Sequence, residues 1–198
     1  MVMPVVMHFA TFLKLLTLNT GDKIRDLERY AKPGGFDFYR PSRDGVVQHC
    51  AHGLTKDRVL KDIEASSTAN SVERNKEIFE KVWGWVAAHP GAAAMPSRGV
   101  WRSPQKIFSV HIEPEISYQF KNEQHVIAVY PRKDVRINRD QAGAGLILLS
   151  RGYRGLGNEK FGILDAFGNK VLRTPTNISE RLLENEIATI EAELARIL

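Results

Sequence analysis

Residues 109–130 read SVHIEPEISYQFKNEQHVIAVY, and the pattern of this stretch decides the fold expected for the chain. The apolar side chains of its first half all fall at even positions, which are Val110, Ile112, Ile116, Tyr118 and Phe120. This period of two is typical of a half-buried strand. The polar residues 121–124 separate that strand from a second β-rich run at 125–130. The stretch therefore predicts an antiparallel hairpin.

The turn of this hairpin sets the expected register of the two strands. A two-residue turn at 122–123 pairs Phe120 with His125 across the hairpin. The same register places Pro114 opposite Pro131, where neither residue can donate to the ladder. Regular pairing is therefore expected to weaken toward that end of the hairpin.

The first half of the chain predicts helices, because its apolar residues recur at helical spacing. The expected helices cover residues 1–18, 20–32, 41–52, 55–64 and 71–89. Thr20 and Thr55 are expected as N-caps, and Pro41 suits a first helical position. Gly53 is expected as a C-terminal cap, and the run Pro33-Gly34-Gly35 ends the second helix.

The N-terminal run Met1–Leu18 is apolar, which raises the question of a signal peptide or a membrane span. It has no positively charged start, and His8 and Lys14 interrupt its apolar residues. We therefore expect an amphipathic helix, no membrane association and a cytoplasmic location. The expected buried stripe of this helix is Val5, Phe9, Phe12, Leu13 and Leu16.

A change of composition at residues 92–102 divides the helical region 1–91 from a β-rich region 92–198. The two regions form either separate domains or one domain, 1–198. Within the second region, Asn138 and Gln141 resemble a capping box that opens a helix through Leu149. Two glycines weaken this helix, and a buried strand at 146–150 is the alternative.

The end of the chain predicts a second hairpin and a final helix. Residues 160–165 and 170–173 form the expected hairpin, and Asn177 is the expected cap of the helix. Leu183, Ile187, Ile190, Leu194 and Ile197 follow with alternating spacings of four and three, which is a heptad seam. This seam either covers the sheet of its own chain or pairs with a second copy.

These elements together predict an α+β fold. A helical N-terminal half packs on an antiparallel, hairpin-based sheet, and the C-terminal helix closes the structure. Cys50 is the single cysteine, so no intrachain disulfide can form, which fits a reducing compartment.

A formal net charge of +5 and a pI near 9.4 make the chain mildly basic. Basic residues are mixed with acids along most of the chain, and Asp134 and Asp140 dilute the basic stretch between Arg132 and Arg154. This stretch includes the start of a glycine-rich loop at 152–158 that lacks the spacing of a phosphate-binding loop. Tyr153 lies among these arginines, an arrangement that can hold single-stranded nucleic acid. The candidate nucleic-acid-binding residues are Arg132, Lys133, Arg136, Arg139, Arg151 and Arg154.

His111, Glu113 and Glu115 alternate along one face of the first predicted strand. An imidazole and two carboxylates could hold a divalent cation or perform acid–base chemistry. The alternative is a solvated outer face of the sheet, paired across the hairpin. His49 and His52 flank Cys50, but no second cluster has the spacing that a zinc site needs.

No catalytic motif stands out, and no cofactor is expected. The first functional hypothesis is a non-enzymatic interaction module that forms a homo-oligomer through the seam residues Leu183, Ile187, Ile190 and Leu194. The second is a nucleic-acid-associated protein that uses the basic stretch Arg132–Arg154. The third is a metal-dependent enzyme built on His111, Glu113 and Glu115.

Overall fold

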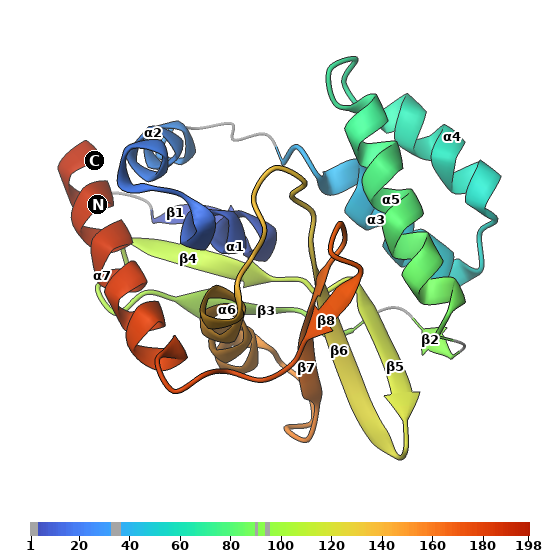
Figure 1. Cartoon of the computed structure of the whole chain (residues 1–198). Coiled ribbons are helices and arrows are strands. Elements are labelled where there is room, and N and C mark those ends of the chain that lie inside the picture. The colour runs from blue at the N-terminus through green and yellow to red at the C-terminus, as the bar shows by residue number, and fades with distance from the viewer. Residues whose placement is uncertain (1–3, 33–36, 90, 94–95) are drawn as a thin grey trace.

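The computed structural model of the chain describes residues 4–32, 37–89, 91–93 and 96–198 (Figure 1). The helices in these ranges are α1 (Phe9–Thr17), α2 (Thr20–Tyr30), α3 (Arg40–His52), α4 (Lys56–Ser66), α5 (Val72–Ala87), α6 (Arg139–Gly152) and α7 (Ser179–Ile197). The strands are β1 (Val5–His8), β2 (Ala92–Ala93), β3 (Gly99–Arg102), β4 (Phe108–Ile112), β5 (Ile116–Phe120), β6 (Glu123–Tyr130), β7 (Lys160–Asp165) and β8 (Lys170–Leu172). The α+β class is as predicted, with helices dominating the first half and α7 at the end of the chain.

The strands of the described residues form two mixed sheets rather than one antiparallel sheet. The first has the order β1-β4-β3 and the second the order β2-β5-β6-β7-β8. β1 is parallel to β4, and β6 is parallel to β7. The stretch 109–120 is therefore not one strand, because it breaks at 113–115 and its halves β4 and β5 belong to different sheets. Pro114 lies in this break and has no N–H to continue a ladder.

The predicted hairpin exists as β5 and β6, but its register differs from the expected one. Tyr118 is opposite His125, and Phe120 is opposite Glu123. The two-residue turn is therefore Lys121-Asn122, whose φ angles are 48° and 62°. Two positive φ values are what a type I′ turn requires, and asparagine tolerates them better than glutamate does.

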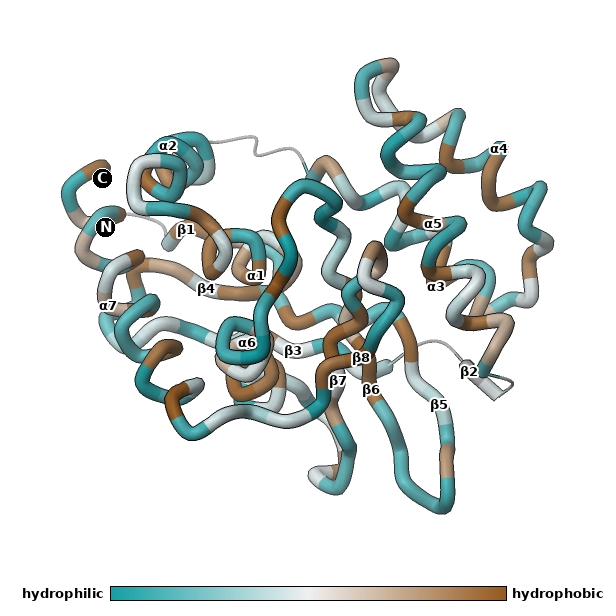
Figure 2. The backbone as a smooth tube through the Cα atoms, viewed as in Figure 1, coloured by the Kyte–Doolittle hydropathy of each residue, from teal (hydrophilic) through white to brown (hydrophobic). Residues whose placement is uncertain are grey.

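The five-stranded sheet is covered on both faces. Along β6, Ala128 and Tyr130 belong to the hydrophobic core that α1, α6 and α7 share, while Ile127 and Val129 belong to the core beneath α3 and α5. Figure 2 shows the central part of β6 and β7 as hydrophobic and their lower ends as hydrophilic. Each core takes side chains from both sides of residue 92, so the two predicted regions share their cores.

Helix α6 forms the parallel connection between β6 and β7, as the capping-box prediction indicated. The Asn138 side chain accepts from the Gln141 N–H at 2.9 Å, and the Gln141 side chain accepts from the Asn138 N–H at 3.0 Å. The alternative strand at 146–150 is not formed. Gly143 is needed inside this helix, because a Cβ atom there would lie 2.0 Å from the Ser179 Oγ atom of α7.

The N-terminal prediction was wrong in part. Residues 5–8 form β1 rather than the start of a helix, because they pair in parallel with β4. The N-cap of α2 is Asn19 rather than Thr20, since its side chain accepts from the Asp22 N–H at 2.9 Å. Residues 1–3 and the expected stop at 33–35 lie outside the described residues.

Other local predictions in this half are confirmed. Pro41 is in the first turn of α3, and Gly53 ends that helix with a left-handed φ of 63°. The Thr55 hydroxyl accepts from the Arg58 N–H at the start of α4. Among the described residues, no helix is long and apolar enough to cross a membrane.

Candidate ligand-binding pocket

The three residues of the predicted acidic and imidazole row separate in the structure. The His111 ring lies edge-on to the His8 ring, with centroids 6.0 Å apart, because β1 and β4 pair these two residues. Glu113 and Glu115 lie in the break between β4 and β5 and both contact Arg43 of α3. Among the described residues, no group of three or more histidines, cysteines and acids could hold a metal ion. The structure therefore does not bring the row together as a metal site.

Arg43 contacts both of these carboxylates and is the centre of a group of charged side chains. We call this group the Arg43 cluster, and its members are Arg43, Asp37, Glu113, Glu115 and His8. The Arg43 Nε atom is 2.7 Å from Glu115, Nη1 is 2.8 Å from Asp37 and Nη2 is 3.4 Å from Glu113. The second Glu115 oxygen accepts from the Val129 N–H at 2.8 Å. This cluster joins α3 to both sheets at the point where β5 begins.

The surroundings of the cluster shift the pKa values of its members. The His8 imidazole, 3.3 Å from Glu113, and the Arg43 guanidinium hold the pKa of the Glu113 carboxyl at about 2. Burial raises the pKa of the Glu115 carboxyl, and Arg43 offsets part of that effect. Burial also opposes the charged form of Arg43, but the three carboxylates outweigh it and keep the pKa of Arg43 above its usual value.

A cavity of about 600 Å³ borders this cluster, lined by His8, Asp37, Arg40, Pro41, Arg43, Asp44, Ser66, Arg98 and Glu113. The charged groups in it are paired with one another. Arg98 is 3.5 Å from Glu113, and Arg40 is 3.3 Å from Asp44. Arg43 already has three carboxylate partners, so the protein itself compensates its charge. We therefore interpret the cluster as a structural contact that holds α3 against the sheets.

The basic stretch Arg132–Arg154 is divided in space by α6. Three candidates precede the helix, namely Arg132, Lys133 and Arg136, and Arg139 is its first residue. Arg151 lies in its last turn, and Arg154 follows it. A 14-residue helix separates its ends by about 20 Å.

Acidic partners also take up part of the charge of this stretch. Lys133 pairs with Glu77 at 2.7 Å, Arg136 with Asp165 at 3.1 Å and Arg151 with Glu180 at 2.6 Å. The structure therefore does not gather these candidates into one basic patch.

The heptad seam of α7 lies inside the chain. Leu183, Ile190 and Leu194 are fully buried, and Ile187 is 6% exposed. They pack in the core that α1 and α6 share, which is the alternative in which the seam covers its own chain. These side chains leave no exposed area for a second copy. The cap predicted at Asn177 is wrong, because α7 begins one residue later, after Ile178.

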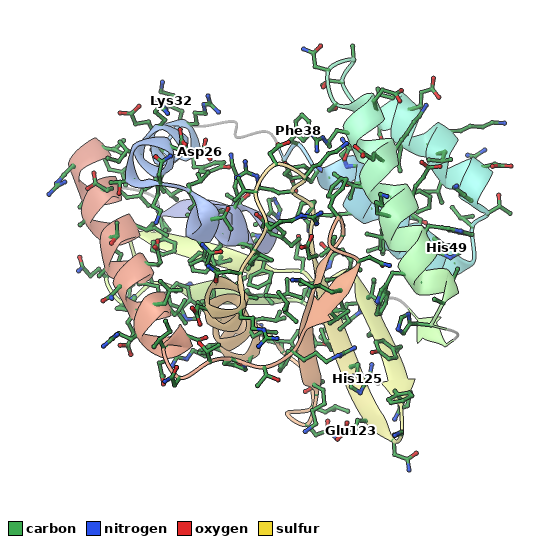
Figure 3. All side chains as sticks on the ribbon, viewed as in Figure 1. Asp26, Lys32, Phe38, His49, Glu123 and His125 are labelled. Atoms are coloured by element: carbon green, nitrogen blue, oxygen red, sulfur yellow. The ribbon has the colours of Figure 1, made fainter. Side chains whose placement is uncertain are left out.

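A different set of residues forms what we call the Arg173 pocket, with a volume of about 380 Å³. Its lining residues are Glu123, His125, Leu146, Ile147, Ser150, Glu159, Lys160, Phe161, Arg173 and Pro175. The pocket lies between α6, the first residues of β6 and β7, and the segment that leads from β8 to α7 (Figure 1). Figure 3 shows His125 and Glu123 at the lower end of the five-stranded sheet.

Two neutral side chains hold the Arg173 guanidinium in this pocket. Nη2 donates to the Tyr118 hydroxyl at 2.7 Å, and Nη1 donates to the His125 Nδ1 atom at 3.2 Å. Tyr118 and His125 face each other across the hairpin, with their rings stacked at 5.0 Å. Among the described residues, no carboxylate lies within ion-pair distance of Arg173.

The acids of the pocket have other partners. Glu123 lies 3.7 Å from both Lys160 and His125. Glu159 accepts from the N–H groups of Leu156 and Gly157 in the adjoining loop. Among the described lining residues, Arg173 is therefore the one cation without a carboxylate within ion-pair distance.

Sequence reasoning missed this pocket because its residues come from four separate segments. The signal that could have found part of it is the turn. Placing the positive φ angles at Lys121-Asn122 rather than at Glu123 sets Tyr118 opposite His125. Nothing local to Arg173 indicates that it returns to this pair, 55 residues from Tyr118 and 48 from His125.

No protein-family model matches the chain, and no curated protein matches its sequence.

Proposed function

We propose that this chain is a non-enzymatic binding module that takes a small organic anion with an apolar body in the Arg173 pocket. The observation that carries the proposal is the Arg173 guanidinium, which two neutral side chains orient and which has no carboxylate partner among the described residues. The proposal keeps the chain in the interaction class and assigns the interaction to a pocket rather than to the α7 seam.

The donor chemistry of Arg173 favours an anion. A guanidinium has five N–H donors in a fixed planar arrangement, and Tyr118 and His125 use two of them. The remaining donors match the oxygens of a carboxylate or a phosphate. Because the side chain is already oriented, a ligand would find it in place and would lose little of its binding free energy to ordering it.

The apolar lining of the pocket favours an apolar body on that anion. Leu146 and Ile147 of α6, Phe161 of β7 and Pro175 line the pocket. A volume of about 380 Å³ is in the range of small-molecule sites, which combine such walls with a few fixed polar groups.

The polar groups of the pocket do not form a nucleophile and base. The Ser150 hydroxyl donates to the Ile147 carbonyl of its own helix at 2.8 Å. The His125 Nδ1 atom accepts from Arg173 and is not directed at a hydroxyl or a thiol. These contacts support binding rather than covalent catalysis.

Calorimetry with octanoate and phenyl phosphate tests the proposal, with 1-octanol as the uncharged comparison. We expect both anions to bind and the alcohol to bind far more weakly. Arg173→Gln should weaken anion binding by about ten- to a hundredfold, because charge-assisted hydrogen bonds contribute roughly 1.5–3 kcal/mol. Arg181→Gln makes the same charge change at an exposed position of α7 and should leave binding unchanged.

Two results would contradict the proposal. One is the absence of any binding by the wild-type chain at millimolar concentrations of both anions. The other is equal binding by the wild type and by a folded Arg173→Gln variant. Equal affinity for octanoate and octanol would show that the apolar wall acts without the guanidinium.

A further inference from the structure

We propose that the Arg173 pocket takes up one proton together with its anion, and that His125 holds this proton. This inference rests on the proposed function and deepens it. The ligand would bind as an anion, and the proton taken up with it would sit on His125. The geometry that carries it is the contact between Arg173 Nη1 and His125 Nδ1 at 3.2 Å.

That contact fixes the protonation state of His125. A guanidinium can only donate, so the His125 Nδ1 atom must accept and carries no proton. The proton of the neutral ring then lies on Nε2. The Nε2 atom is buried and has no hydrogen-bond partner among the described residues, and a Glu123 oxygen lies 3.7 Å from it. His125 is therefore neutral while Arg173 donates to it.

The charged and titratable groups around His125 come from every element packed against it. Arg173 follows β8, Lys160 lies opposite His125 on β7, and Glu123 precedes it on β6. The Tyr118 ring stacks on it from β5. Arg173 and Lys160 oppose a positive charge on the ring, while Glu123 favours one. Burial and Arg173 outweigh Glu123, so the pKa of His125 is lower than usual.

An anion on Arg173 would reverse this balance. Its charge would offset the guanidinium, and one of its oxygens would replace the ring nitrogen as the acceptor from Nη1, while the Tyr118 hydroxyl still accepts from Nη2 and keeps the guanidinium oriented. The Nδ1 atom would then be free to take a proton from the solvent and to donate it to the second oxygen of the ligand. No covalent bond to carbon forms or breaks, and the proton comes from water or buffer.

Calorimetry of octanoate binding in Bis-Tris, imidazole and Tris at pH 7 measures the proton directly. The apparent binding enthalpy of the wild type should change with the ionisation enthalpy of the buffer, with a slope that approaches one proton taken up. The affinity should also rise as the pH falls from 8 to 6.5, by at most about tenfold per pH unit for one linked proton.

His125→Asn is the informative variant. The Asn oxygen can still accept from Arg173 but cannot titrate, so octanoate should bind with no buffer dependence. His52→Asn changes an exposed histidine at the end of α3 and should keep the wild-type slope. An NMR titration of His125 in the wild-type chain is a second measurement that needs no variant. The pKa of His125 should be higher with octanoate bound than without it.

The outcomes separate the two proposals. Octanoate binding with a zero slope in the wild type, or an unchanged pKa of His125, would overturn proton uptake and leave anion binding intact. A slope that persists in His125→Asn would place the proton elsewhere and would also overturn the inference. The absence of octanoate binding in the wild type would instead overturn the proposed function.

Discussion

Arg43 and Arg173 are the same residue type in two opposite surroundings. Arg43 is nearly buried and contacts Asp37, Glu113 and Glu115. Arg173 is exposed at its pocket, contacts Tyr118 and His125 and has no carboxylate partner among the described residues. Both guanidinia are fixed in orientation, but only the first has its charge compensated by the protein.

The difference separates two uses of a charge. A buried ion pair is expensive to form and very costly to break, because removal of one partner leaves the other buried and uncompensated. Such a group holds the fold in one arrangement. A guanidinium that neutral side chains orient contributes little to the free energy of unfolding. Its charge is not compensated within the protein, so it can pair with the charge of a ligand. The two sites should therefore respond to substitution in opposite ways.

The largest expected effect is loss of stability at Arg43. Arg43→Gln leaves up to three carboxylates without their shared cation, and we expect the free energy of unfolding to fall by about 3–5 kcal/mol. Urea unfolding followed by circular dichroism measures it. Arg40→Gln, on the same helix, breaks only the exposed pair with Asp44 and should cost less than about 1 kcal/mol. A loss below about 1 kcal/mol for Arg43→Gln would contradict a structural role of the Arg43 cluster.

A smaller effect on stability is expected at Glu113, and this effect should depend on pH. The pKa of its carboxyl is about 2 in the folded state against 4.5 as the usual value. A carboxyl with a lowered pKa stabilises the fold above pH 4.5, and this contribution is lost as the pH falls toward 2. Glu113→Gln should therefore cost about 1–2 kcal/mol at pH 7, allowing for screening of a partly exposed group, and almost nothing at pH 2.

Unfolding curves of the wild type and Glu113→Gln between pH 7 and pH 2 test this dependence. The two free energies should converge as the pH falls. Parallel curves would mean that the Glu113 carboxylate adds no stability through His8 and Arg43. Glu180→Gln removes an exposed carboxylate of α7 and serves as the comparison.

The contacts that the sequence predicts are those between residues close along the chain. The Asn138 and Gln141 capping box, the Thr55 cap and the left-handed Gly53 were all predicted from residues within four positions. Each depends on backbone groups that the same helix end leaves unpaired, so no knowledge of the fold is needed.

The turn of the hairpin and two helix caps were misplaced by one residue, but the larger errors arose where distant segments decide the structure. Residues 5–8 have the apolar pattern of the following helix, but pairing with β4, about a hundred residues away, makes them a strand. The alternation through 110–120 continues across Pro114, although the chain changes sheets there. Neither the pairing of β1 nor the change of sheet can be predicted from a short stretch of sequence, because tertiary pairing overrides the local pattern.

The two arginine sites were missed for the same reason. Glu115 was predicted to face solvent with His111, yet it is buried against Arg43, which is 72 residues away in the sequence. An alternating pattern gives the face of a residue only while the strand continues. Once the strand breaks at 113–115, the face of Glu115 is set by β5 and its sheet rather than by β4.

The smallest expected effect on stability is at Arg173. Arg173→Gln removes the guanidinium donors of two hydrogen bonds to the buried Tyr118 and His125 side chains but breaks no ion pair. We expect the free energy of unfolding to fall by about 1 kcal/mol, since the glutamine amide can still donate to one partner and a typical hydrogen bond contributes roughly 0.5–1.5 kcal/mol. The same urea experiment measures this change beside Arg43→Gln. A loss as large as that of Arg43→Gln would mean that Arg173 also serves the fold, and the guanidinium would then no longer be a charge held for a ligand. A small loss of stability together with abolished octanoate binding would support a structural role for Arg43 and a binding role for Arg173.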